Sequence, residues 1–217
     1  GDVELVPRVH GRFFDLNAIS QYSGLRKITE EKSKESLKVC SLLNGDVVTI
    51  HPGRCWLKED EDFYGKCQNW FKSYLNEISR TAKEENVQIA LETGSHPADY
   101  PGIPDELYSI ISKKERIGIT LDIAHTFLHA NNLDVSPEEW ICDMIERFGD
   151  QILNVHLHDN NGQVDQHRPP GEGSINFEPI INTLKNHYDG PLILEIWNPS
   201  GPAEAGEKAI NKTREFL

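Results

Sequence analysis

The sequence has little that would suit a membrane protein or a general nucleic-acid binder. No apolar run in the 217 residues approaches the length of a membrane span, and the first residues lack the charged and then apolar layout of a secretory signal. Basic residues are scarce, since 22 Lys and Arg face 35 Asp and Glu, for a formal net charge of -13. We therefore expect no membrane partner, and nucleic acid only through a local basic patch.

Cysteine is also scarce. The four cysteines form no C-x-x-C pair, and in an acidic chain of enzyme size the default is reduced thiols in the cytoplasm. A bridge between Cys55 and Cys67 is a less favoured alternative. The chain also lacks G-x-G-x-x-G and a phosphate-binding lysine loop, which removes the main support for a doubly wound nucleotide-binding sheet.

Short runs rich in apolar and β-branched residues predict strands, and each run finishes on His, Asp or Glu. The runs are Val3–His10, Asp46–His51, Val87–Glu92, Ile117–Asp122, Ile152–His156 and Pro191–Glu195. Stretches with helical periodicity lie between them, at about residues 28–43, 63–78, 104–111, 137–148, 177–187 and 203–217. Ser136 with Glu139 reads as a capping box, and Pro104 and Pro137 suit first helical positions.

Strands that alternate with helices about every 30 to 40 residues predict a parallel sheet built from βα units. We expect an α/β fold, a TIM (β/α) barrel, in a single domain over residues 1–217. Six strands are read where a closed barrel has eight. The first one or two βα units are therefore expected to be missing from the start of this sequence. A smaller, partly open barrel is the alternative.

Ionisable side chains close all six predicted strands. They are His10, His51, Glu92, Asp122, His156 and Glu195, and the following loops add His125, Asp165 and His167. Parallel strands bring their carboxyl ends to one face, so we expect these nine groups to converge. Imidazoles with carboxylates suit zinc or manganese. A lone histidine such as His10 is more often a hydrogen-bonded core or loop residue, and the two glutamates could instead be ion-pair partners.

The motifs around these residues resemble the xylose isomerase-like TIM-barrel superfamily, which includes sugar-phosphate isomerases, epimerases and endonuclease IV. The resemblance rests on V-H-G-R-F-F-D-L-N at His10, T-I-H-P-G at His51, A-L-E-T-G at Glu92, L-D-I-A-H at Asp122 and His125, V-H-L-H-D-N at His156, V-D-Q-H-R-P-P-G-E-G at Asp165 and His167, and L-I-L-E at Glu195. It covers essentially the whole chain. The H-L-H-D-N form differs from the H-L-N-D of endonuclease IV and is closer to sugar-phosphate isomerase-like members.

The resemblance implies two possible metal sites. In the isomerase and epimerase branch, one divalent metal is held by the residues matching Glu92, Asp122, His156 and Glu195. The two glutamates there act as acid and base, and the residue matching His125 contacts the substrate. In endonuclease IV, all nine matching positions bind three zinc ions, which adds His10, His51, His125, Asp165 and His167.

We expect a metal-dependent isomerase or epimerase acting on a sugar or sugar phosphate, with one to three Zn²⁺ or Mn²⁺ ions. Its expected catalytic residues are Glu92, Glu195 and His125. Its expected substrate contacts are His51, His158, Arg168 and Phe13. The alternative is a zinc phosphodiesterase acting on abasic DNA, and a barrel that binds without catalysis is a third hypothesis. Only Arg8, Arg12, Arg54 and Arg168 are placed to contact phosphates, a thin set for DNA.

Overall fold

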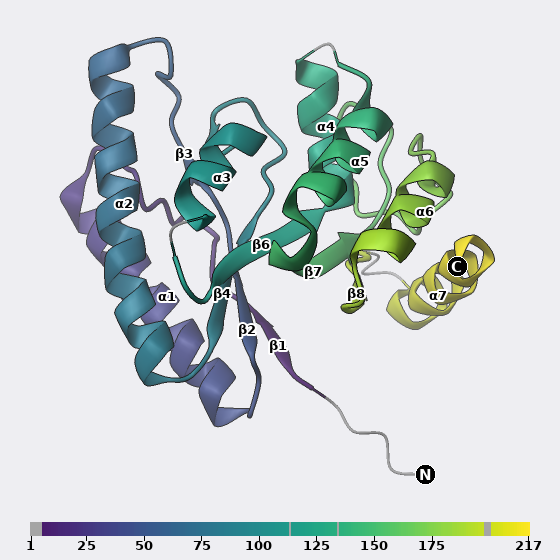
Figure 1. Cartoon of the computed structure of the whole chain (residues 1–217), viewed down its shortest axis with the longest axis horizontal. Helices are drawn as coiled ribbons and strands as arrows, with labels where there is room; N and C mark the ends of the chain where they lie inside the picture. Colours follow the sequence, from purple (N-terminus) through teal and green to yellow (C-terminus); the bar gives the residue numbers. More distant parts are fainter. Residues whose placement is uncertain (1–5, 113, 134, 198–200) are drawn as a thin grey trace. The chain divides into compact units, whose positions relative to one another are not determined.

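Strands and helices alternate along the chain, as the sequence predicts (Figure 1). The computed structural model describes residues 6–112, 114–133, 135–197 and 201–217. The chain divides into two units. The N-terminal unit comprises residues 1–92 and 98–119, and the C-terminal unit comprises residues 93–97 and 120–217. The expectation of one domain over the whole chain stays a prediction.

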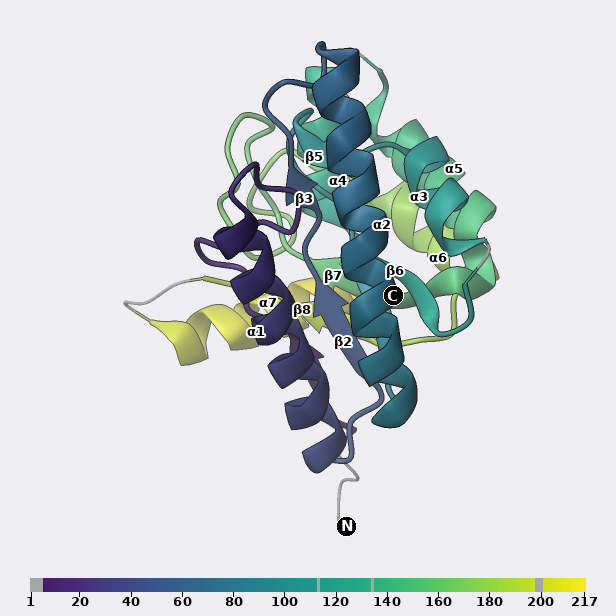
Figure 2. The ribbon, with the colours of Figure 1, turned by 90° about the vertical axis from the view of Figure 1, so that its left-hand side faces the viewer.

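Three parallel strands form the centre of the N-terminal unit. Strand β1 (Arg8–His10) pairs with β2 (Val47–Ile50), which pairs with β4 (Gln88–Glu92). All four residues of β2 are buried, as expected of a strand with neighbours on both sides. Helices α1 (Ser23–Leu42) and α2 (Glu61–Glu84) lie side by side next to these strands (Figure 2). Helices α1 and α2 thus pack against the three strands whose carboxyl ends carry the predicted ligands.

The sequence of α2 shows why this helix forms and which of its faces is buried. The side chain of Asp60 caps it by accepting a hydrogen bond from the backbone N–H of Phe63. Its first turn carries two acidic residues, whose negative charges stabilise the helix by interacting with the positive end of its dipole. Its apolar face is buried through Cys67, Phe71, Tyr74, Leu75 and Ile78.

Smaller elements complete the N-terminal unit. Strands β3 (Gly53–Arg54) and β5 (Asp99–Tyr100) form an antiparallel pair, and α3 (Pro104–Ile111) begins at its proline as predicted. Strand β6 (Ile117–Asp122) begins in this unit beside β4, because the N–H of Ile89 bonds the carbonyl of Arg116. The second half of β6 belongs to the C-terminal unit.

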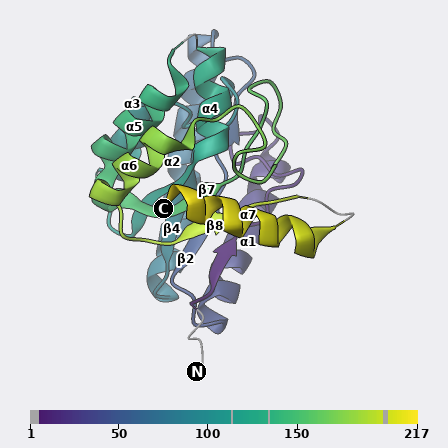
Figure 3. The same ribbon diagram turned by 90° about the vertical axis from the view of Figure 1, so that its right-hand side faces the viewer.

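The C-terminal unit continues the alternation. Its elements are the end of β6, α4 (Ile123–Asn132), α5 (Pro137–Phe148), a 3-10 turn (Gly149–Gln151), β7 (Ile152–Leu157), α6 (Phe177–His187), β8 (Leu192–Leu194) and α7 (Pro202–Phe216). Strands β7 and β8 are parallel, with His156 opposite Ile193. Helices α5 and α6 lie side by side (Figure 3).

The α/β class and the six strands β1, β2, β4, β6, β7 and β8 are confirmed. The prediction missed α4 and the β3–β5 pair. Helix α1 begins at Ser23, five residues before the predicted start at Ile28. The expected capping box is wrong, because the Ser136 side chain makes no capping hydrogen bond, although Pro137 does open α5. Residues 3–5 of the first predicted strand lie outside the described residues.

Two further expectations bear on the class of protein. Within the described residues, no helix combines the length and the apolar character that a membrane crossing needs.

All four cysteines are free thiols, and Cys40, Cys55 and Cys67 are buried. Burial, with a hydrogen bond donated by the Cys67 thiol to Cys55, raises the pKa of Cys67 to about 12. The Cys55–Cys67 bridge therefore is not formed in the structure.

Candidate functional site

Three of the predicted ligands meet in the N-terminal unit, at or just after the ends of β1, β2 and β4. The Nε2 atoms of His10 and His51 lie 3.3 Å apart. His51 Nε2 lies 2.7 Å from a carboxylate oxygen of Glu92, and His10 Nε2 lies 3.6 Å from that oxygen. The Glu92 side chain is 1% exposed, and a buried carboxylate needs such partners to stay charged. The structure therefore brings these three predicted residues together.

Phe13 shapes this group from one side. Its ring stacks on His51 with centroids 4.3 Å apart and an interplanar angle of 4°, and it meets the edge of His10 at 5.1 Å. The Nδ1 atom of His10 is bonded to the carbonyl of Gly11 at 2.8 Å. Both imidazoles are thus held so that their Nε2 atoms point to one place.

Three of the four arginines considered for DNA form ion pairs within the N-terminal unit. Arg8 pairs with Asp46 at 3.2 Å, and Arg12 pairs with Glu35 at 3.1 Å. Arg54 pairs with buried Asp99 at 2.8 Å. Each pair neutralises an arginine charge that phosphate binding would require.

A second group lies in the C-terminal unit and contains Asp122, His156 and Glu195. The Nδ1 atom of His156 lies 3.1 Å from Glu195 Oε1 and 3.8 Å from Asp122 Oδ2. Asp122 and His156 are buried, whereas the Glu195 side chain is 22% exposed. All three were predicted, and they provide a mixed nitrogen and oxygen donor set.

Local structure fixes the position of Asp122. It ends β6 and is also the N-cap of α4, where its Oδ1 accepts the N–H of His125 at 2.7 Å. Its own N–H donates to the hydroxyl of Thr93 at 3.0 Å. One carboxylate oxygen is therefore used by the helix cap, and Oδ2 is left for the side chains of the site.

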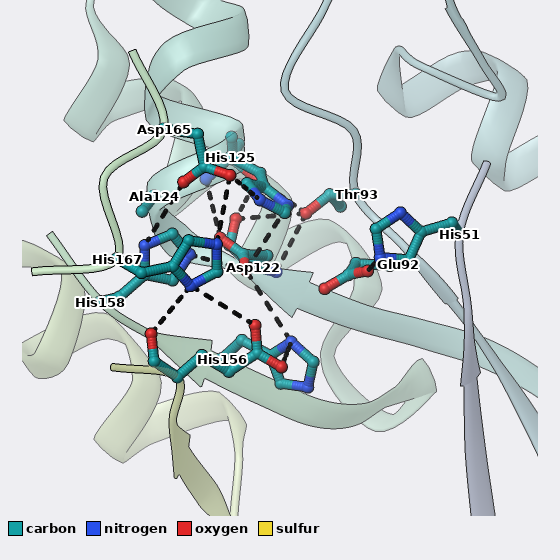
Figure 4. A network of polar contacts seen from close by, with 12 residues as sticks. His51, Glu92, Thr93, Asp122, Ala124, His125, His156, His158, Asp165 and His167 are labelled. Atoms are coloured by element: carbon teal, nitrogen blue, oxygen red, sulfur yellow. Dashed lines mark hydrogen bonds and ion pairs between the residues drawn. The ribbon is translucent and has the colours of Figure 1, made fainter. Parts of the chain in front are cut away.

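A third group gathers around Asp165, which was predicted together with His125 and His167 (Figure 4). Asp165 Oδ2 lies 3.1 Å from His125 Nε2 and 3.2 Å from His167 Nε2. His158 joins them, with its ring stacked on that of His167 at 3.9 Å between centroids. The sequence predicted His158 as a substrate contact and as a possible addition to the metal ligands.

The charges within this group are strongly coupled. Burial opposes ionisation of Asp165, but hydrogen bonds from His125 and His167 outweigh it and hold the pKa of Asp165 far below its usual range. Burial likewise opposes the charged form of His167, yet the hydrogen bond and charge of Asp165 raise its pKa. The pairing therefore favours the ionised form of Asp165 and the protonated form of His167.

A buried carboxylate orders the loop that carries Asp165 and His167. The side chain of Asp159 accepts the backbone N–H groups of Asn160, Gly171, Gly173 and Ile175 at 2.8 to 3.3 Å. Gly173 packs so closely on Asp159 that no Cβ would fit there. The sequence suggested Asp159 only as one of several possible metal ligands or acid-base groups and did not predict that it orders this loop, for which the signal was a carboxylate followed by a glycine-rich loop.

The separations in these groups fit a metal ion. Two ligands with bonds of about 2.0 to 2.2 Å at a tetrahedral angle lie roughly 3.3 to 3.6 Å apart. The nitrogen–nitrogen distance is 3.3 Å in the first group. The nitrogen–oxygen distances are 2.7 and 3.6 Å in the first group, 3.1 and 3.8 Å in the second, and 3.1 and 3.2 Å in the third. In addition, the buried Nδ1 atom of His158 has no hydrogen-bond partner among the described residues.

The comparisons with known proteins now decide the family. The family described as xylose isomerase-like TIM barrel matches residues 2–217. The chain belongs to this family. The crystal structure of a D-tagatose 3-epimerase-like protein shares its fold with a TM-score of 0.80 and 30% identity, covering 99% of this chain and 78% of the other. The expected TIM-barrel class is thereby confirmed.

Relatives within the family differ in chemistry. An uncharacterized protein of Methanocaldococcus jannaschii is 33% identical over 204 residues, which are 91% of this chain and 66% of the relative. The inosose isomerase of Halalkalibacterium halodurans is 27% identical and covers 65% of this chain and 50% of the relative. Apurinic-apyrimidinic endonuclease 1 of Plasmodium falciparum is also 27% identical, over 74% of this chain and 28% of the relative. The chain thus spans less than two thirds of these relatives.

The structure brings together the predicted ligands within each unit. The expectation that all nine converge at one mouth stays a prediction, as does the set of substrate contacts. Among those contacts, Arg168 is exposed and its guanidinium donates to the carbonyl of Glu172 at 3.2 Å.

Proposed function

We propose that this chain carries out metal-dependent isomerisation or epimerisation of a sugar, a sugar phosphate or a related hydroxyketone. The observation that carries the proposal is the group of Asp122, His156 and Glu195, in which two buried donors stand beside one accessible carboxylate. Zinc and manganese both suit these donors. Glu92 is assigned to the same metal by the family resemblance.

The exposure of the three side chains suggests which of them bind the metal and which one transfers a proton. A divalent ion held by these residues would act as a Lewis acid toward the carbonyl and hydroxyl oxygens of the substrate. Asp122 and His156 are buried and serve to hold it. Glu195 is the member that a substrate can reach, and it takes or returns a proton at the carbon beside the carbonyl. Glu92 is proposed to do the same on the other face of the sugar.

The contacts of His125 bear on its proposed role. Its Nε2 atom is bonded to Asp165 at 3.1 Å, and its Nδ1 atom faces Asp122 Oδ2 at 3.5 Å. Both ring nitrogens thus lie against carboxylates. The substrate contact proposed for His125 requires that a substrate oxygen replaces one of these two contacts.

A zinc phosphodiesterase acting on abasic DNA is the second candidate. It is favoured by the two further groups, His10 with His51 and Glu92, and His125 with Asp165 and His167, because three metal sites suit phosphodiester hydrolysis. The paired arginines Arg8, Arg12 and Arg54 weigh against it. The net charge of -13 also opposes association with a polyanion.

Activity assays of the purified full chain separate the two candidates. The chain is stripped with a chelator, reloaded with Zn²⁺ or Mn²⁺, and incubated with a panel of ketoses and inososes and with a duplex that contains one abasic site. The proposal predicts metal-dependent conversion of at least one carbonyl compound without incision of the duplex. Incision without any conversion would establish the second candidate instead.

A further inference from the structure

A cavity of about 540 Å³ lies between helices α2 and α3 of the N-terminal unit (Figure 1) and is called the α2–α3 cavity below. Hydrogen bonds join its two walls near its ends. Tyr64 on α2 donates to Glu106 on α3, and Lys114, just after α3, donates to Asn76 on α2 at 2.7 Å. Cavities of this volume accommodate small organic ligands.

The floor of the α2–α3 cavity is apolar and its rim is polar. Phe71 and Leu75 of α2 are each 1% exposed, and Tyr100 of β5 is 7% exposed. The exposed amide side chains of Gln68 and Asn69 contribute to the rim. The cavity therefore suits a ligand that has both an apolar part and a polar group.

The charge of the lining is opposite to that of the whole protein. Among the described residues, the lining includes two lysines, Lys72 and Lys114, and no Asp or Glu, whereas the chain carries a formal net charge of -13. The ammonium group of Lys114 is held at Asn76, which lies one helical turn beyond Lys72 on the same face of α2. Both ammonium groups can therefore reach one anionic group at this end of the cavity.

Neither lysine is neutralised by a carboxylate of the protein. Lys114 donates to an uncharged amide, and Lys72 forms no hydrogen bond or ion pair with any residue that the structure describes. In contrast, Lys32, Lys34 and Lys212 each pair with a glutamate. The positive charge at the cavity is thus available to a ligand.

The hydroxyl of Tyr100 offers a further donor at the floor. It makes no hydrogen bond within the described part of the chain. Burial and the negative charge of Glu106 raise the pKa of Tyr100 to about 12, so the hydroxyl stays protonated. An oxygen atom on the organic part of a ligand can accept its hydrogen bond.

We propose that the α2–α3 cavity binds a phosphorylated small molecule, with its phosphate between Lys72 and Lys114 and its organic part against Phe71, Leu75 and Tyr100. A phosphate monoester carries about 1.5 to 2 negative charges near neutral pH, which two ammonium groups match better than they match a single carboxylate. The lining contains none of the predicted metal ligands or substrate contacts. The inference therefore does not depend on the proposed function.

A titration of the full chain with phenyl phosphate, followed by phosphorus NMR, tests the charge requirement. A chelator is present throughout, so that no metal ion contributes to phosphate binding. We expect the wild type to bind phenyl phosphate more tightly than inorganic phosphate, and Lys72→Met to bind it at least about tenfold more weakly. Lys66→Met, also exposed on α2 but outside the lining, is the matched control and should keep the wild-type affinity.

A second pair of variants tests the cavity itself without removing a lysine. Ser109→Trp places an indole at the α3 wall and should abolish binding, whereas Ser73→Trp, exposed on α2 outside the lining, should bind as the wild type does. Wild-type affinity in Lys72→Met or in Ser109→Trp would overturn the proposal. So would equal affinity for the two phosphates, or a wild type that binds no phenyl phosphate at millimolar concentrations. No turnover is measured, so failure here is distinguishable from failure of the proposed function.

Discussion

The Nδ1 atom of His156 lies 3.1 Å from the Oε1 atom of Glu195. The pair joins the neighbouring strands β7 and β8, because His156 stands opposite Ile193, two residues before Glu195. The imidazole is buried and the carboxylate is partly exposed. The contact therefore places the partly exposed carboxylate of Glu195 beside two buried donors, Asp122 and His156.

Replacing Glu195 should remove catalysis and spare the fold. In Glu195→Gln we expect kcat to fall by about 10²- to 10⁴-fold, the usual contribution of a general acid or base. The change is isosteric and the side chain is partly exposed, so the thermal midpoint should stay close to that of the wild type. Glu204→Gln, on the exposed side of α7, is the control and should keep full activity. Full activity of Glu195→Gln would contradict both enzymatic candidates.

Removing Asp165 and His167 should separate the candidates by metal content. Asp165→Ala combined with His167→Ala should lose metal under the nuclease candidate, which needs several ions, and should keep the ion at Asp122, His156 and Glu195 under the isomerase proposal. Turnover of a carbonyl substrate should survive with a loss of at most roughly 100-fold, as for other changes behind a metal ligand. Elemental analysis and a kinetic assay on one sample check this. Retained turnover with one tight metal would reject the nuclease, and complete loss would favour it.

The stability of the metal-free chain should depend on pH through His167. Its pKa is raised in the folded state by Asp165, although burial acts the other way. The contribution to stability is therefore fully present below the ordinary pKa of histidine and is lost as the pH rises through the raised value. With a chelator present, the unfolding free energy of the wild type should fall over this range more than that of His167→Asn. If the unfolding free energies of the two proteins fell equally with pH, the pairing of His167 with Asp165 would be contradicted.

Metal binding should show the opposite dependence on pH. A ligand histidine must be neutral, so binding releases the proton that His167 otherwise holds. Affinity for Zn²⁺ should therefore increase as the pH rises through the raised pKa. Calorimetric titration in buffers of different ionisation enthalpy measures the proton release. Binding without release of a proton would show that His167 is not a ligand.

The role of Asp159 in ordering the loop after β7 can be tested by substitutions at two glycines. In Gly173→Ala the new Cβ would collide with Asp159 and with the carbonyl of Asn160, so we expect a destabilisation of about 1 to 3 kcal/mol. Gly206 lies inside α7 with open space around it, and Gly206→Ala should stabilise by roughly 0.5 to 1 kcal/mol. Denaturant unfolding of both variants provides the comparison. Equal effects would show that the loop is not held as described.

The sequence predicted the strand ends well because the signal there is local. An apolar run that stops at an ionisable residue marks both a buried strand and a functional edge, and Glu92 and Asp122 close β4 and β6 as expected. Helix α4 was missed because it follows β6 without a turn and is buried on all sides from Ile123 to Ala130. Such a segment has no amphipathic period to recognise.

Other features depend on contacts distant in sequence and could not be read from residue types. His158 lies beside Asp122 and Asp165, which are distant from it or in another loop in the sequence, so its residue type and its place near the end of a strand do not reveal these neighbours. Asp159 gains its role from backbone groups up to 16 residues away. The Ser136 cap failed because a capping pattern permits a hydrogen bond without requiring one.

The central claim, metal-dependent proton transfer at a carbon beside a carbonyl, is tested most directly by isotope exchange. The metal-loaded full chain is incubated in D₂O with D-tagatose, D-fructose and an inosose, and proton NMR follows the signal at that carbon. The account predicts deuterium incorporation into at least one compound, abolished by chelation and in Glu195→Gln. No incorporation into any of them, together with metal-dependent incision of an abasic-site duplex, would contradict it.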